Sequence, residues 1–100
     1  MTIKKKENPW VLVRTYSAGV HFGRLAERHG KEVRLTKTRR IWYWSGAASL
    51  SEMALRGVKH PKICRFSVMI SEITLTEAIE IIPCTAESVA NIQAVPEWAA

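Results

Sequence analysis

Short runs of β-branched and aromatic residues, separated by turn-forming residues, constrain the fold of this chain more than any other feature. Residues 10–16 are rich in valine and aromatic side chains without a helical period, and residues 17–19 follow with turn chemistry. Residues 63–70 alternate apolar and polar side chains, which is typical of a strand with one buried face. The pattern predicts a sheet built from several short strands.

Three further segments fit this sheet. Residues 20–28 alternate imperfectly, so they predict a strand and leave a short helix open. Residues 31–43 predict one long strand, or two strands separated at 38–39. His29 and Gly30 predict a hairpin corner between these segments, because glycine accepts the positive φ of a tight turn. Residues 73–82 contain six β-branched residues, which favours a strand over a helix.

One segment carries the full set of helix signals. Ser49 is suited to cap a helix, and Glu52 three residues later completes a capping box. Apolar residues follow at helical spacing, and Gly57 is a typical stop. A second, shorter helix is predicted after Thr85. The sum is an α+β fold: a mainly antiparallel sheet or half-open barrel of about five or six strands, one central helix and a short C-terminal helix.

The length of 100 residues is that of one ordinary domain. Residues 10–100 are therefore predicted to form a single compact domain, preceded by a flexible basic arm over residues 1–9. Trp98 is expected to dock on that domain, because its ring is costly to leave in water. The two cysteines are too few for a disulfide framework, and no apolar stretch is long enough to span a membrane. These features predict a soluble protein in a reducing cytoplasm.

The charge is unevenly distributed along the chain. The formal net charge is +6, but eleven basic and three acidic residues give residues 1–50 a charge of +8, while four basic and six acidic residues give residues 51–100 a charge of −2. A basic surface raises the encounter rate with anionic partners. We therefore expect an anionic partner, which is a nucleotide, a nucleic acid or an acidic host protein.

The most unusual segment joins two arginines, three aromatic residues and a small-residue loop that enters the predicted central helix. A helix start offers free N–H groups to a phosphate, arginine binds phosphate through two hydrogen bonds, and an indole stacks on a base. The same residues also suit a purely structural role in which a tryptophan enters the core and Ser49 only caps. The candidate anion or nucleotide site comprises Arg39, Arg40, Trp42, Trp44, Ser45, Gly46, Ala47 and Ser49. We place it at an interface between copies of the chain.

No catalytic residue, metal site or cofactor is predicted. The histidines at positions 21, 29 and 60 are scattered among predicted turns and strands, and neither cysteine has metal-ligand spacing or a visible third group to activate it. The basic residues with Tyr16, Phe22 and Trp42 could bind nucleic acid through phosphates and stacking, but no known nucleic-acid-binding motif is present.

Residues 40–51 (RIWYWSGAASLS) and 74–85 (TLTEAIEIIPCT), with residues 18–20 and 22–23 upstream, resemble a family of small uncharacterised proteins of tailed phages and prophages. The resemblance covers roughly residues 10–85 and implies a phage-encoded accessory protein in the cytoplasm of the bacterial host. We expect a non-enzymatic, homo-oligomeric binding protein that blocks a host antiviral defence component, by sequestering a signalling nucleotide or by occupying a host nucleoprotein. The alternatives are a nucleic-acid-binding accessory protein of phage replication or packaging, and a structural component of the virion.

Overall fold

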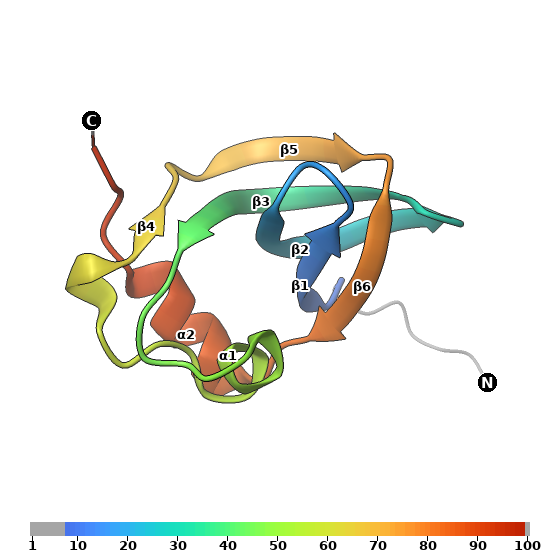
Figure 1. The fold of residues 1–100 in the computed structure, drawn as a ribbon. Helices are drawn as coiled ribbons and strands as arrows, with labels where there is room; N and C mark the ends of the chain where they lie inside the picture. Colours follow the sequence, from blue (N-terminus) through green and yellow to red (C-terminus); the bar gives the residue numbers. More distant parts are fainter. Residues whose placement is uncertain (1–7, 100) are drawn as a thin grey trace.

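A six-stranded antiparallel sheet and two helices make up the computed structural model, which describes residues 8–99 (Figure 1). This architecture confirms the predicted α+β fold, and the sheet does not close into a barrel. The strands are β1 (Trp10–Thr15), β2 (Val20–His29), β3 (Glu32–Tyr43), β4 (Arg65–Phe66), β5 (Ile70–Leu75) and β6 (Ala78–Pro83). The helices are α1 (Leu50–Arg56) and α2 (Ala86–Ala94), with a 3₁₀ turn, η1, at Pro61–Ile63.

Most of the predicted basic arm, residues 1–7, lies outside the described residues. Its last two residues are held by β2. The carbonyl oxygen of Asn8 accepts hydrogen bonds from the Arg24 guanidinium at 3.1 and 3.2 Å, and that of Pro9 accepts one from the Leu25 amide at 2.8 Å. Among the described residues, no helix is long and apolar enough to cross a membrane.

The sheet is strongly curled. β5 pairs with one side of β3, and β6 pairs with the far side of β1, so these two consecutive strands lie at opposite edges of the five strands β5-β3-β2-β1-β6. Figure 1 shows the sharp turn that carries the chain from β5 into β6. The curl brings the start of β6 to the β2–β3 turn, where the Ala78 amide donates to the Lys31 carbonyl at 3.0 Å.

Irregularities in β2 and β3 produce this curl. The pairing register shifts between Phe22 and Arg24 and again between Leu25 and Glu27, and such bulges bend a strand and increase its twist. Lys37 has φ 51°, as the extra residue of a bulge often does. Gly23 lies opposite this point, where an added Cβ would stand 3.0 Å from the Thr36 carbonyl oxygen, so the close approach requires glycine.

The two faces of the curled sheet bury two separate cores. The inner core lies within the curl and comprises Val11, Val13, Val33, Leu35, Leu75 and Ala78. The helix core lies on the other face, where Leu12, Phe22, Ile41 and Phe66 meet the buried side chains of both helices. Because successive strand residues point to opposite faces, Leu12 belongs to the helix core while its neighbours in β1 belong to the inner core.

The helix signals in the sequence are confirmed in detail. The Ser49 hydroxyl accepts from the Glu52 amide at 3.1 Å, and the Glu52 carboxylate accepts from the Ala48 amide at 2.8 Å. Gly57 ends α1 with φ 83°. Thr85 caps α2, and the side-chain amide of Asn91 bridges the backbone of Val58 at 2.8 and 2.9 Å, which ties α2 to the end of α1.

The strand predictions are right for the first half of the chain and partly wrong for the second. Residues 20–28 belong to a strand rather than a helix, and residues 32–43 form one strand that bends at the bulge. The predicted strand 63–70 is reduced to β4, with η1 before it and an irregular link, residues 67–69, after it. The predicted strand 73–82 is two strands, because the chain turns at 76–77 to reach the opposite edge of the sheet.

Candidate functional site

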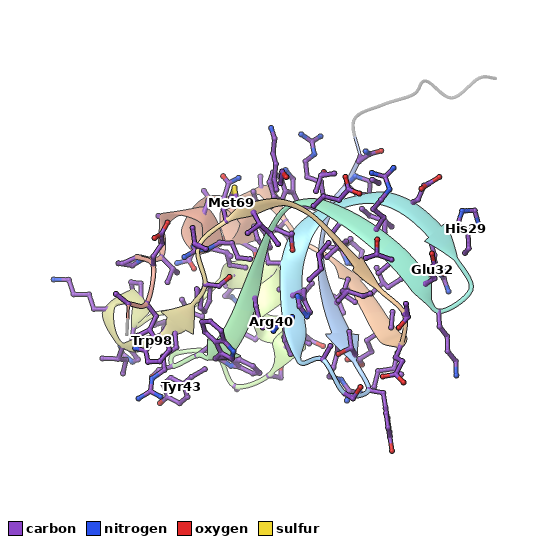
Figure 2. The ribbon with its side chains drawn as sticks, turned by 90° about the horizontal axis from the view of Figure 1, so that it is seen from above. His29, Glu32, Arg40, Tyr43, Met69 and Trp98 are labelled. Carbon is purple, nitrogen blue, oxygen red and sulfur yellow. The ribbon has the colours of Figure 1, made fainter. Side chains whose placement is uncertain are left out.

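A cavity of about 250 Å³ continues the inner face of the sheet beyond the inner core. Cross-strand pairing explains its position: His21 lies opposite Val13 of the inner core on one side and opposite Arg40 on the other, and residues directly opposite each other share a face. Figure 2 shows Arg40 over the middle of the sheet, between Tyr43 and Trp98 at one end and the β2–β3 hairpin tip at the other. The lining residues are His21, Thr38, Arg40, Trp42, Ser67, Val68, Ile70 and Ile73.

Three of these lining residues each carry a buried polar atom without a protein partner. Within residues 8–99, His21 Nδ1, Thr38 Oγ1 and Arg40 Nε are covered from solvent and have no hydrogen-bond partner. The side chains of His21 and Thr38 are each only 1% exposed. A buried polar atom without a partner costs about 1–3 kcal/mol. Three such atoms, on residues that line one cavity, therefore indicate a place where a polar ligand would be stabilised.

The remaining cavity wall is largely apolar and partly exposed. Val68 and Ile70 are 51% and 45% exposed, and Trp42 is 53% exposed. The Trp98 ring packs edge-on against Trp42 at 5.5 Å between centroids, and the Trp98 amide donates to the Phe66 carbonyl at 2.9 Å. The docking expected for Trp98 is thus confirmed, and it holds one side of the Trp42 indole in place at the cavity mouth.

His21 is held in one tautomer by its other ring nitrogen. Nε2 lies 2.9 Å from the Ala18 carbonyl oxygen, so Nε2 must carry a hydrogen. Burial lowers the pKa of His21 from its ordinary value of 6.5; the bond to Ala18 opposes this shift, and the positive charge of Arg40 adds to it. His21 is therefore neutral at neutral pH, and its Nδ1 keeps a lone pair that no protein group uses among the described residues.

This shift makes folding pH-dependent. Because the pKa of His21 is lower in the folded state, the unfolded chain binds the proton more tightly, and the free energy of unfolding should fall as the pH drops below 6.5. It should be flat above about pH 7.5. Urea denaturation of the wild type and of His21→Phe between pH 5.5 and 8 measures this. The variant should lose the slope, and equal slopes in both proteins would refute the assignment.

Arg40 and Trp42 are the two residues of the predicted site that line the cavity. Arg39 lies on the opposite face because it directly precedes Arg40 in β3 and successive strand residues point to opposite faces, and only 3% of it is exposed. Its Nε donates to the Ser67 carbonyl and one Nη to the Ile92 carbonyl, both at 2.8 Å, and its guanidinium lies 5.3 Å from the Phe66 ring centre. Burial lowers its pKa, and nearby Glu97 opposes this. Arg39 thus joins β3, the 67–69 link and α2.

The predicted small-residue loop does not face the cavity either. Its helix start is already capped by Ser49 and by the Glu52 carboxylate, which occupies the amide of Ala48. Gly46 lies against the backbone of residues 59–60, and the Lys59 amide donates to its carbonyl at 3.3 Å. Ser45 accepts from the His60 amide at 3.3 Å. This loop therefore has a structural role: Ser49 caps α1, as the sequence left open, while Ser45 and Gly46 pack against another loop, which the sequence did not predict.

The indole of Trp44 donates to the Ala47 carbonyl at 3.2 Å, and both residues pack against the helix core. The site thus draws on only one end of the predicted segment. It also contains residues that sequence reasoning missed: His21, Thr38, Ser67, Val68, Ile70 and Ile73. The one available signal was the alternation of β2, which puts His21 in a strand between two apolar neighbours.

The cysteines and carboxylates contribute little to this face. Burial raises the pKa of the Cys84 thiol to about 11, against a smaller opposing effect of a hydrogen bond from Ser88. In residues 8–99, no group of three histidine, cysteine, aspartate or glutamate side chains is placed to hold a metal ion.

Comparison with known proteins places the chain in a family. Residues 8–92 match the family described as Domain of unknown function (DUF6948). Because the match covers most of the chain, the protein belongs to this family. No curated protein and no solved structure matches it.

Proposed function

We propose that this DUF6948 protein is a non-enzymatic binding protein that sequesters a nucleotide in the cavity on the inner face of its sheet. The observation that carries the proposal is that three residues lining one cavity, His21, Thr38 and Arg40, each carry a buried polar atom without a partner, while the other walls are largely apolar. Ligand pockets in proteins combine such apolar walls with a few converging polar groups.

The chemistry of the lining residues fits a nucleotide. The exposed indole of Trp42 offers a stacking surface to a planar base, and base–aromatic stacking contributes about 1–3 kcal/mol. The Arg40 guanidinium brings a permanent positive charge to the same cavity, where it attracts an anionic ligand. One planar and one anionic group in a single ligand would use both residues.

Part of the basic charge in the first half of the chain is paired or buried, and one arginine lies at the cavity. Arg14 pairs with Glu80 at 2.9 Å, and Arg34 pairs with Glu27 at 3.1 Å. Arg39 is buried and engaged with backbone carbonyls. Among the described residues of this half, Arg14 and Arg34 are thus paired and Arg39 is buried, and Arg40 lies at the cavity.

The resemblance to phage proteins suggests the biological setting. We propose that the protein acts in the bacterial cytoplasm against a host antiviral defence component, by removing its signalling nucleotide. β5 and β6 are edge strands that carry the exposed side chains of Ile70 and Ile79, and exposed apolar edges favour pairing with a second copy. A homo-oligomer is therefore part of the proposal.

The test measures nucleotide affinity by calorimetry, with native mass spectrometry for oligomeric state. The probes are mononucleotides, cyclic mononucleotides and cyclic dinucleotides of each base. Arg40→Ala and Trp42→Ala should each weaken the tightest probe about fivefold or more, since each removes about 1–3 kcal/mol of contact. Lys62→Ala and Tyr16→Ala are the matched controls, because both residues are exposed away from the cavity. Absence of any binding at 1 mM (about −4 kcal/mol) would overturn the proposal.

The salt dependence of the affinity distinguishes the proposed nucleotide-binding protein from the alternative, a nucleic-acid-binding protein. A protein that neutralises Z phosphates of duplex DNA loses affinity with a slope of about −0.9Z in log–log form. If duplex or single-stranded DNA binds more tightly than every nucleotide, with a steep slope that Lys31→Ala, at an exposed position of the basic half, reduces and Trp42→Ala does not, the basic surface rather than the cavity is the binding site.

A further inference from the structure

We refer to three of the lining residues, His21, Thr38 and Arg40, as the floor of the cavity. Within this floor, His21 selects for a ligand that carries a hydrogen-bond donor. His21 Nε2 carries its hydrogen to the Ala18 carbonyl, so the neutral ring has only a lone pair left at Nδ1. A carboxylate or phosphate oxygen also offers only lone pairs, and the two would repel each other. The group that reaches His21 must therefore carry an N–H or O–H.

Arg40, the neighbour of His21 in the floor, requires the complementary group on the ligand, which is a hydrogen-bond acceptor. Arg40 lies directly across from His21 on the paired strand, and its unpartnered Nε is a donor that needs an acceptor. Opposite residues in an antiparallel pair have Cβ atoms about 4.5–5.5 Å apart. Thr38 Oγ1, which is both donor and acceptor, lines the same floor. The floor thus matches a ligand edge in which a donor and an acceptor lie side by side.

The size of the cavity limits how much of a ligand enters. Its volume of about 250 Å³ is below the range of about 300–1,000 Å³ that is usual for pockets that enclose a drug-sized ligand. A whole nucleotide therefore leaves part of itself outside. The polar atoms are covered, so a ligand reaches them only if lining side chains move, and Val68 and Ile70 are lining residues that are partly exposed.

Building on the function proposed above, we infer that the nucleotide enters base first: the polar edge of its base pairs with His21, Thr38 and Arg40, and its phosphate stays at the mouth. The Watson–Crick edge of every base presents ring or exocyclic N–H donors beside N or O acceptors. In this orientation the hydrogen bonds of the cavity distinguish one base from another. The phosphate contributes to affinity through long-range attraction to Arg40. This orientation is the opposite of the one expected from the sequence, in which the arginines bind the phosphate.

Ligand fragments test the orientation. The probes are the four ribonucleosides, their 5′-monophosphates, ribose 5-phosphate and inorganic phosphate, measured by calorimetry. Base-first binding predicts that the best nucleoside binds within about tenfold of its monophosphate, since an exposed charge contact contributes about 1 kcal/mol or less. Ribose 5-phosphate and phosphate should bind at least about thirtyfold more weakly, because they leave the floor unpaired. If ribose 5-phosphate binds as well as the monophosphates, the inference is wrong while the proposed function stands.

Protein variants and pH test the floor itself. Thr38→Val keeps the shape of the side chain and should weaken the best nucleoside about fivefold or more, as should His21→Phe. Ser71→Ala, at an exposed position of β5, is the control. Thermal melts establish that each variant is folded.

Lowering the pH should change ligand affinity in opposite directions for base-first and phosphate-first binding. Arg40 is the only other ionisable side chain among the residues that line the cavity. Protonation converts Nδ1 from an acceptor into a donor, and burial holds the pKa of His21 below its ordinary value of 6.5, so nucleoside affinity should fall as the pH drops through this lowered pKa. A phosphate-first site would gain affinity instead. If Thr38→Val and His21→Phe bind nucleosides like the wild type, the floor holds only buried water and the inference is overturned.

Discussion

Arg39→Ala is expected to lower the free energy of unfolding by about 3–5 kcal/mol, a large part of the stability of a domain of this size. The guanidinium donates to the carbonyl oxygens of Ser67 and Ile92, and each charge-assisted bond contributes about 1.5–3 kcal/mol. Alanine leaves both carbonyls buried without a donor and also empties the space over the Phe66 ring.

Urea denaturation measures this change, and the melting temperature should fall by more than about 12 °C. Arg40→Ala is the matched control, because it removes the same group one residue further along β3 from the opposite face. Its effect on stability should stay within about 1 kcal/mol, since Arg40 makes no side-chain hydrogen bond among the described residues. Arg39→Lys should fall between the two, because an ammonium cannot reproduce the planar fork. A loss below 1 kcal/mol for Arg39→Ala would contradict the role assigned to it.

Gly46→Ala is expected to destabilise the protein by about 3–5 kcal/mol, from backbone strain and overpacking together. Gly46 has φ 98°, and an added Cβ would stand 2.8 Å from the His60 amide nitrogen and closer still to that of Lys59. These are backbone atoms, so no side-chain rotation relieves the clash. The hydrogen bonds that join residues 45–46 to 59–60 should break.

Gly19→Ala separates the two causes. Gly19 also has a positive φ, 84°, but an added Cβ would meet nothing within 4 Å. It should therefore lose only the strain of about 1–2 kcal/mol. Chemical denaturation of both variants gives the comparison. Equal losses would show that the loop at Gly46 yields easily, and the close packing argued for it would then be wrong.

Local sequence signals predicted the elements that depend on local chemistry. The capping pair of Ser49 and Glu52, the stop at Gly57, the cap at Thr85 and the corner at Gly30 are all present, because each involves contacts within a few residues along the chain. The strands that were mispredicted depend on distant partners. β5 and β6 look like one β-branched run, but they separate because β3 and β1 pair with different halves of it.

The candidate site was predictable only in part for the same reason. Arg40 and Trp42 stand out by composition, and both line the cavity. Arg39 stands out equally, and strand alternation sends it to the other face. His21 and Thr38 carry no motif. They join the site because the register pairs His21 with Arg40 and because the bulge at Lys37 returns Thr38 to the inner face.

The sequence by itself determined the class of this fold, its two helices with their caps, and the segment from which the cationic and aromatic groups of the cavity come. These follow from periodicity and from hydrogen bonds between near neighbours. Only the tertiary structure decided that Arg40 faces the cavity, that Arg39 is buried on the other face, and that His21 lies opposite Arg40. Those outcomes depend on strand register and bulges, where a shift of one residue turns every side chain to the opposite face of the sheet.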